Sequence, residues 1–218
     1  MKKIIFFFSL LLLLSGCMRF RAAQRIKSYR IQSIAILPVD MVMSGRIPAR
    51  MSPEEYQKRV DDGKRFMQQA LYSELVRSAD LRRRRYSMVE FQGIDKTKQL
   101  LQQNNISDSA CQSLDGAYLA KILGVDAVLR ARVSKVQIMS NEAGFGLDMA
   151  GGVLRSIGVN PPVPIPNART GDVYISCSLL TGDGPIWATN FANGIDWNLP
   201  VEAIMQHNAR ALVRRLRL

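Results

Sequence analysis

The sequence predicts an α/β (α+β) domain behind an N-terminal export signal. Strand patterns and helix-period stripes alternate along most of the chain, as in domains that pack helices on a sheet. Ser33–Val39 is an apolar, β-branched run typical of a buried strand, and Pro53–Ala79 carries a helical stripe. Near the C-terminus, two strand patterns flank the turn Thr181–Gly184, which predicts an antiparallel hairpin.

The first seventeen residues have the three parts of an export signal. Two lysines precede the apolar run Ile4–Leu14, and small residues lead to Cys17. Leu14–Cys17 resembles a bacterial lipobox. The resemblance implies a diacylglyceryl group on the Cys17 thiol, removal of residues 1–16 as a signal peptide, and acylation of the new amine. An ordinary signal peptide or a short signal anchor is the alternative interpretation.

The lipid would fix the protein to a membrane, because stable attachment takes about two acyl chains and a processed lipoprotein has three. Residue 18 is Met, and the absence of Asp there resembles the pattern of lipoproteins sent to the cell outer membrane. We therefore expect a palmitate-type anchor in that membrane and a domain facing the periplasm.

Residues 17–32 read as a lipidated basic tether. Their cations would lie beside anionic head groups, where each adds about 1 kcal/mol of attraction; a solvated linker is the alternative. The tether's basic residues after Cys17 are Arg19, Arg21, Arg25, Lys27 and Arg30.

The chain is basic, with 30 Lys and Arg against 18 Asp and Glu in 218 residues and a net charge of +12. In an exported protein this charge meets phospholipid head groups and other envelope polyanions. We therefore predict no nucleic-acid partner, with a merely solvated basic surface as the alternative.

The two cysteines beyond Cys17 allow one disulfide in an oxidising compartment. Cys177 lies at an inward position of a strand pattern, where a free cysteine behaves as a small apolar residue. We favour two buried thiols at Cys111 and Cys177, with the disulfide as the alternative.

The first half of the domain, predicted from Ser33, begins with the strand Ser33–Val39 and an irregular stretch, Met41–Met51. Ser52 is placed to cap the long helix that Pro53 begins, with Glu55 completing a capping box. A run of four arginines, Arg82–Arg85, follows as a solvated segment or, alternatively, a polyanion contact. Further predicted elements are a strand Tyr86–Phe91 and helices Lys96–Gln103 and Asp115–Leu123, the last ended by Gly124.

The stretch Val125–Ile138 predicts a long strand with one solvated face. Its alternation sets Arg130, Arg132 and Ser134 opposite a row of apolar residues. An exposed basic row on a sheet is a candidate partner surface.

The segment 140–171 is an insertion with six glycines and four prolines. A loop of this length in a compact domain is usually functional or mobile. We favour a flexible or partly helical loop over a lipid-facing strand across residues 143–159, because Arg155 would lie on the apolar face of that strand.

The C-terminal part predicts strands Asp172–Leu180 and Pro185–Ala192 and a final helix that Asn198 and Pro200 open. Apolar residues of the first strand face inward, and arginines enrich the C-terminal end of the helix, where cations suit the helix dipole.

Recognisable catalytic constellations are missing from the sequence. A single histidine, His207, makes no His-rich metal site, and no Cys/His spacing, nucleophile elbow or phosphate-binding glycine loop is present. We therefore expect no enzymatic activity, no cofactor and no metal, although an enclosed pair of carboxylates would escape such a search.

Three short motifs resemble one group of bacterial lipoproteins. They are Ile34–Val39, Leu123–Leu129 and Thr181–Trp187. The group is the CsgG, penicillin-binding-protein activator and DUF799-like lipoproteins, related to the TolB amino-terminal domain. The resemblance implies a three-layer domain whose mixed, mostly antiparallel sheet is flanked by helices.

The same resemblance implies a role by protein–protein contact in assembly or regulation of a cell-envelope machine. The expected partners are the membrane, an unknown envelope protein and, as a possibility, further copies of the chain. Two alternatives are an oligomeric outer-membrane export-channel subunit and an envelope hydrolase.

Overall fold

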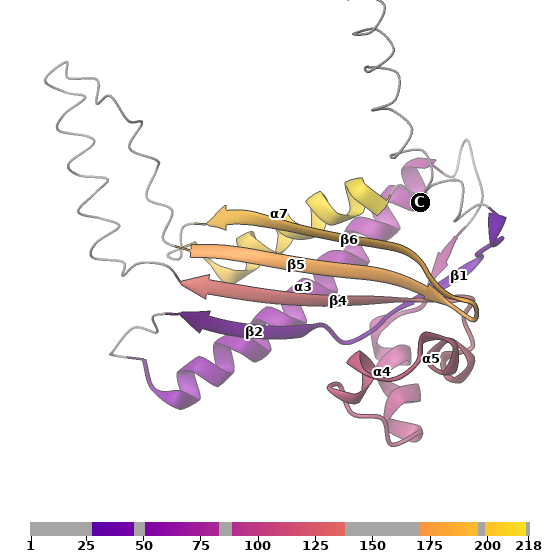
Figure 1. The fold of residues 1–218 in the computed structure, drawn as a ribbon, viewed down its shortest axis with the longest axis horizontal. Helices are drawn as coiled ribbons and strands as arrows, with labels where there is room; N and C mark the ends of the chain where they lie inside the picture. The colour runs from indigo at the N-terminus through magenta and orange to yellow at the C-terminus, as the bar shows by residue number, and fades with distance from the viewer. Residues whose placement is uncertain (1–27, 46–50, 83–88, 138–170, 196–198, 217–218) are drawn as a thin grey trace, which may run out of the picture.

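The computed structural model describes residues 28–45, 51–82, 89–137, 171–195 and 199–216. These residues form a six-stranded mixed sheet with helices on both faces (Figure 1). The strands are β1 (Ser33–Ile36), β2 (Asp40–Gly45), β3 (Glu90–Phe91), β4 (Ala127–Gln137), β5 (Gly171–Thr181) and β6 (Gly184–Ile195). The helices are α3 (Pro53–Arg82), α4 (Ile94–Gln103), the 3₁₀ helix η1 (Ala110–Gln112), α5 (Gly116–Leu123) and α7 (Val201–Leu216). The α/β fold with a mixed sheet between helices is confirmed.

The strand order is β3-β1-β4-β5-β6, and β2 also pairs with β4. The contacts of β1 with β3 and β4, and of β2 with β4, are parallel and short. The two antiparallel ladders, β4 with β5 and β5 with β6, join eleven residue pairs each and form the main body of the sheet.

The predicted strand Ser33–Val39 divides at Pro38, and this corrects the sequence-based boundaries. Pro38 has no N–H to donate, so β1 ends at Ile36 and the chain resumes pairing on β4 as β2. The prediction of an irregular stretch from Met41 is wrong as far as Gly45; residues 46–50 lie outside the described residues. Alternating burial, with Met41 and Met43 inward and Val42 exposed, identifies a true strand.

Helices α3 and α7 cover one face of the sheet and run parallel to each other (Figure 1). The Ser52 hydroxyl accepts a hydrogen bond from the Glu55 N–H at 3.1 Å, which confirms the predicted cap. At this end of α3, Gly63 lies against Val201 of α7, and farther along Glu74 accepts a hydrogen bond from Gln206. The larger apolar core fills the space between these helices and the sheet.

On the other face, the described residues form a cover at one end, made of α4, η1 and α5. A second, smaller core there joins Leu119 and Leu123 of α5 to Ala35, Leu37 and Val128 of the sheet region. Gly124 ends α5 with a φ of 65°, as predicted for a glycine stop. The predicted solvated face of β4 is covered at this end, where Val128 is fully buried.

The predicted hairpin is confirmed, and β6 continues beyond Ala192 to Ile195. The expected strand Tyr86–Phe91 is described only in part: Glu90 and Phe91 are paired, and residues 86–88 lie outside the described residues. The folded core also begins before Ser33, since Ile31 is only 4% exposed and belongs to the larger core.

Candidate functional site

Several predicted functional segments lie outside the described residues. They are the signal peptide 1–16, Cys17 itself, the tether as far as residue 27, residues 83–85 of the arginine run, and 140–170 of the Gly/Pro insertion. No described helix has the length and apolarity that a membrane crossing needs. The candidate site among the described residues is therefore the part of the sheet that α4 and α5 leave uncovered, which we call the open face.

The open face is built from three rows of side chains on adjacent strands, because partners in register point to the same side. The first row joins Arg130, Ser178 and Ala188, and the second joins Asp40, Arg132, Ser176 and Asn190. The third joins Val42, Ser134, Tyr174 and Ala192. The predicted basic row of β4 therefore runs through the middle of this surface.

A groove of about 200 Å³ lies over the first two rows, beside η1. The Gln112 amide forms its rim and donates to the Pro38 carbonyl at 2.8 Å. The residues that line the groove are Gln112, Arg130, Arg132, Ser176, Cys177, Ser178, Ala188 and Asn190. The lining mixes polar and apolar surface, and its charged side chains are two cations and no carboxylate.

Arg130 is the half-buried cation of the groove. Its Nη2 donates to the Leu114 carbonyl, while its Nε is buried without a hydrogen-bond partner among the described residues. Burial lowers the pKa of Arg130, with the charge of Arg132 acting in the same direction. An unpaired buried donor costs the folded state about 1–3 kcal/mol.

Arg132 is the exposed cation of the groove, with 58% of its side chain accessible. Its Nε donates to the Asp40 carboxylate at 2.8 Å. Asp40 holds the guanidinium in place across the β2–β4 pair and leaves most of it open to solvent.

The adjoining third row adds apolar area to the open face. Val42 and Tyr174 are 50% and 49% exposed, and both are partners of Ser134 in the sheet register. Exposed apolar side chains beside a charged groove are typical of a protein-contact surface.

The described cysteines are structural. Cys111 and Cys177 are free and buried, which confirms the favoured prediction of two thiols. Burial raises the pKa of Cys111 to about 11, and burial raises the pKa of Cys177 still further. Both are therefore protonated at neutral pH, and neither has the thiolate that reactive cysteines need.

Metal-binding and acid–base groups are dispersed in the described part of the chain. No three of its His, Cys, Asp and Glu side chains are placed to hold a metal ion. His207 is exposed on α7. The groove on the open face has no carboxylate, and two further pockets beside α3 contain one each.

A second charged site, which the sequence patterns do not predict, lies between α3 and α7. Glu74 is 4% exposed and accepts hydrogen bonds from Arg77, from Arg210 at 3.0 Å and from Gln206 at 2.6 Å. Burial alone would raise the pKa of Glu74, but the hydrogen bonds and charges of the two arginines outweigh it, so its pKa lies below the usual range. The only sequence signal was a Glu on the apolar side of a helical stripe.

Comparisons with known proteins bear mainly on the N-terminus. The model of the prokaryotic membrane lipoprotein lipid attachment site matches residues 1–17, so the match ends at Cys17. The search of curated proteins found no match.

Two solved structures resemble the chain in part. Lipoprotein GNA1162 from Neisseria meningitidis is 13% identical, covers 85% of this chain and 96% of its own, and has a TM-score of 0.46. The LpoB C-terminal domain from Salmonella enterica is 10% identical, covers 83% of this chain and 97% of its own, and has a TM-score of 0.34. At these scores the likenesses say nothing about function. The match to the lipid attachment site identifies the chain as a lipid-anchored envelope lipoprotein.

Proposed function

We propose that the protein is held at the periplasmic side of the cell outer membrane by lipid on Cys17 and acts there by protein–protein contact. In this proposal residues 1–16 are removed, the domain performs no reaction, and binding assembles or regulates a cell-envelope machine. The observation that carries the proposal is the groove on the open face, which Arg130 and Arg132 line with positive charge.

The chemistry of the groove defines the kind of partner that it would bind. Arg130 and Arg132 supply guanidinium donors, and Ser176, Ser178 and Asn190 supply neutral hydrogen-bonding groups. A carboxylate pairs well with guanidinium donors, and an acidic segment of an envelope protein would present carboxylates together with backbone carbonyls. Val42 and Tyr174 would bury apolar side chains of the same partner.

Membership of the CsgG, penicillin-binding-protein activator and DUF799-like group is part of this proposal. Its support is the placement of the quoted motifs: Leu123–Leu129 forms the junction from α5 to β4, and Thr181–Trp187 forms the turn between β5 and β6. The export-channel alternative depends on residues 143–159, which lie outside the described residues. The hydrolase alternative needs convergent carboxylates, and the groove contains none.

Photo-cross-linking in intact cells tests the proposed contact. A photoreactive amino acid replaces exposed Ser176 in the groove or, as the control, exposed Lys98 on α4. We expect a cross-linked partner from position 176 and not from position 98. Adding Arg132→Glu should abolish the cross-link from position 176, because the new carboxylate repels an acidic segment.

The product identifies the partner class. An adduct with a different envelope protein supports the proposal, and an adduct of two copies of this chain supports the oligomer alternative. Equal cross-linking from both positions, or a product that Arg132→Glu leaves unchanged, contradicts a specific contact at the groove.

A further inference from the structure

The C-terminal halves of α3 and α7 form a cationic surface, which we call the arginine surface. Arg77 and Arg210 are held by Glu74, and Arg214 follows one helical turn farther along α7, whereas the guanidinium of Arg215 lies over the Phe191 ring of β6 at 3.9 Å. From Ala203 to Leu216, α7 contains three arginines and no acidic residue. A groove of about 130 Å³ between the two helices is lined by Glu74, Arg77, Ser78, Leu81, Arg210, Val213 and Arg214.

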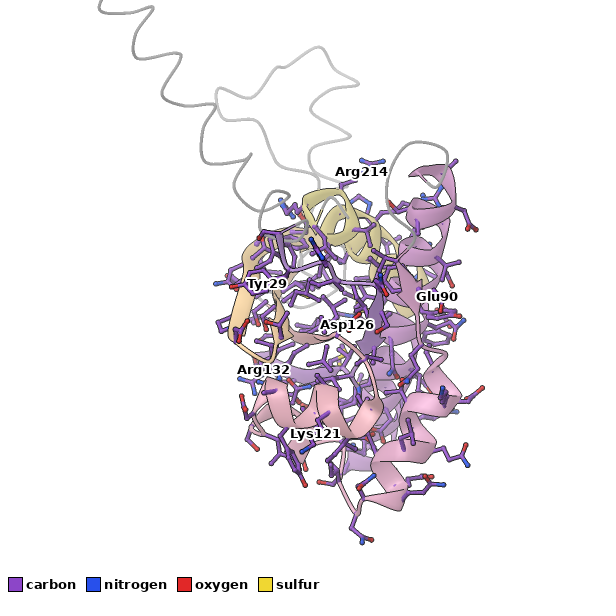
Figure 2. The ribbon with its side chains drawn as sticks, turned by 90° about the vertical axis from the view of Figure 1, so that its right-hand side faces the viewer. Tyr29, Glu90, Lys121, Asp126, Arg132 and Arg214 are labelled. Atoms are coloured by element: carbon purple, nitrogen blue, oxygen red, sulfur yellow. The ribbon has the colours of Figure 1, made fainter. Side chains whose placement is uncertain are left out.

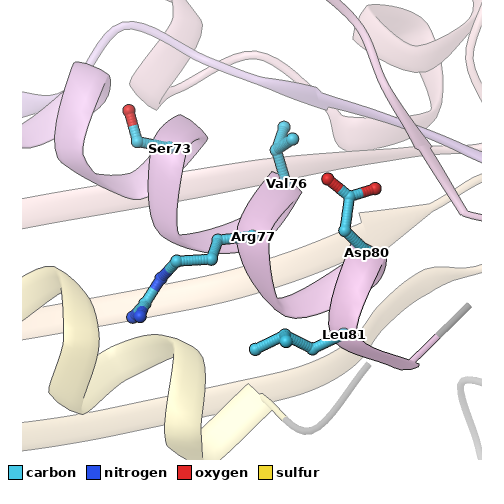
Figure 3. Close-up of a pocket in the computed structure, with 5 residues that line it drawn as sticks. All are labelled: Ser73, Val76, Arg77, Asp80 and Leu81. Atoms are coloured by element: carbon cyan, nitrogen blue, oxygen red, sulfur yellow. The ribbon is translucent and has the colours of Figure 1, made fainter.

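The arrangement around Glu74 points the cations outward. The Glu74 side chain is 5% exposed, whereas those of Arg77 and Arg210 are 60% and 52% exposed. One buried carboxylate therefore orients two guanidinium groups and leaves most of their hydrogen-bonding capacity open to solvent. Arg77 and Leu81 extend from α3 on the side of α7, and Asp80 points to the opposite side of the helix (Figure 3).

Acidic and basic side chains are equal in number in each half of α3. In the N-terminal half they pair along the helix, as in Glu55 with Arg59 at 2.8 Å and Asp61 with Lys64 at 3.5 Å. The excess positive charge at the C-terminal end of the α3–α7 layer therefore comes from the arginines of α7. At that end Leu81, 75% exposed, adds an apolar side chain among the arginines.

The arginine surface lies at the end of the sheet at which β1 begins (Figure 1). The start of β1 and the C-terminal ends of α3 and α7 share one end of the sheet (Figure 1). Seen from that end, Arg214 lies on the helical side and Lys121 on the opposite side of the sheet (Figure 2). Eleven peptide steps separate Cys17 from Ser28, so a lipid on Cys17 would keep Ser28 within at most about 36–40 Å of the bilayer.

We propose that the arginine surface binds the head groups of anionic phospholipids and orients the domain with the ends of α3 and α7 toward the membrane. The inference rests on the proposed lipid anchor. Guanidinium groups bind phosphate through paired hydrogen bonds, and Leu81 enters the boundary between head groups and acyl chains. The groove on the open face is left accessible to a protein partner.

Fluorescence on the full, lipidated protein tests this orientation. An environment-sensitive dye is attached at Leu81→Cys or, as the matched control on the same helix, at Glu54→Cys; Cys111 and Cys177 are buried and do not compete for the dye. The labelled protein is reconstituted into phosphatidylcholine vesicles with or without phosphatidylglycerol. We expect the dye at position 81 to shift to the blue and to be quenched by head-group spin labels, but only when phosphatidylglycerol is present. High salt should reverse both changes, and the dye at position 54 should show neither.

Charge variants measure the contribution of the arginines. Each cation near an anionic surface contributes about 1 kcal/mol, so Arg210→Gln with Arg214→Gln should lower the docked-to-free ratio about 30-fold. The matched double neutralisation Lys96→Gln with Lys98→Gln on α4, across the sheet, should leave the ratio unchanged.

The outcomes separate the two proposals. Failure to float with neutral vesicles overturns the lipid anchor. Flotation without a phosphatidylglycerol-dependent change at position 81, equal quenching at position 54, or equal effects of the two double variants overturns head-group docking by the arginine surface.

Discussion

Lys135 occupies a core-facing position of β4 and is only 2% exposed. Its place in the alternation, after Ala131 and Val133, puts it on the inward side of the strand. Burial lowers the pKa of Lys135 to about 8, and the charge of Arg59 adds to the effect. The ammonium group is therefore a cost to the folded state at neutral pH.

Replacing Lys135 by Met should stabilise the protein at pH 7. The Lys135 pKa falls from 10.5 to about 8 on folding, which corresponds to about 3 kcal/mol. Between pH 8 and 10.5 the unfolded chain holds more protons at this residue than the folded one, so wild-type stability rises with pH. The difference in the free energy of unfolding between the wild type and Lys135→Met should therefore shrink toward zero by pH 10.5.

Urea unfolding followed by tryptophan fluorescence, at pH 7 and pH 10.5, measures this difference. Lys121→Met, at an exposed position on α5, is the control and should show no pH-dependent gap from the wild type. A gap for Lys135→Met that stays constant across this range would show that the ammonium is not the cause.

At the scale of elements, the docking of α5 on β5 depends on a close approach. Gly116 is the first residue of α5, and a Cβ added there would lie 2.5 Å from Cβ of Leu180. Neither atom is at the flexible end of a side chain, so backbone would have to move.

Gly116→Ala should therefore destabilise the domain by about 1–3 kcal/mol through overpacking. Gly93→Ala is the matched control, because Gly93 also lies at the start of a helix, has a φ of −58° and has open space around its Cβ position. Thermal unfolding of the two variants compares them directly. Equal melting temperatures would mean that α5 moves away from β5 without cost.

At the scale of the whole molecule, the sequence predicted the fold better than the site. Strong periodicity identified α3, the hairpin and α7, and the Ser52 cap and Gly124 stop were correct because they are local features. The division of β1 from β2 at Pro38 was missed, because the methionines of β2 are weak strand signals and their burial depends on α3.

The charged sites also depend on contacts between residues that are distant in sequence, which local patterns do not predict. Arg130 and Arg132 could be found from alternation within one strand, whereas the half-burial of Arg130 depends on η1 and Leu114, which lie far from it in sequence. The Glu74 site joins residues more than 130 positions apart, and pairings of that kind are not encoded in local pattern.

Changing Cys17 to Ala should release the protein from membranes. The lipid contributes most of the expected membrane affinity, whereas a few cations give a reversible, salt-sensitive attachment. Cell fractionation at low and high salt measures the change, with Cys111→Ala as a control for loss of a thiol. Salt-resistant membrane association of Cys17→Ala would contradict lipid attachment at this residue.

Asp126 has a mechanical consequence for an anchored protein. Its carboxylate accepts hydrogen bonds from the N–H groups of Gln32 and Ser33, both at 2.8 Å, just where the chain enters β1. These hydrogen bonds, partly offset by burial, hold the pKa of Asp126 below its usual range, so the carboxylate is charged at neutral pH. A pulling force between the membrane and a bound partner would reach the domain through these bonds before it reaches the pairing of β1 with β4. The Asp126 bonds and the buried Ile31 would then share the tension where the chain enters the sheet, and the load would pass from β1 through β4 to a partner bound on the open face.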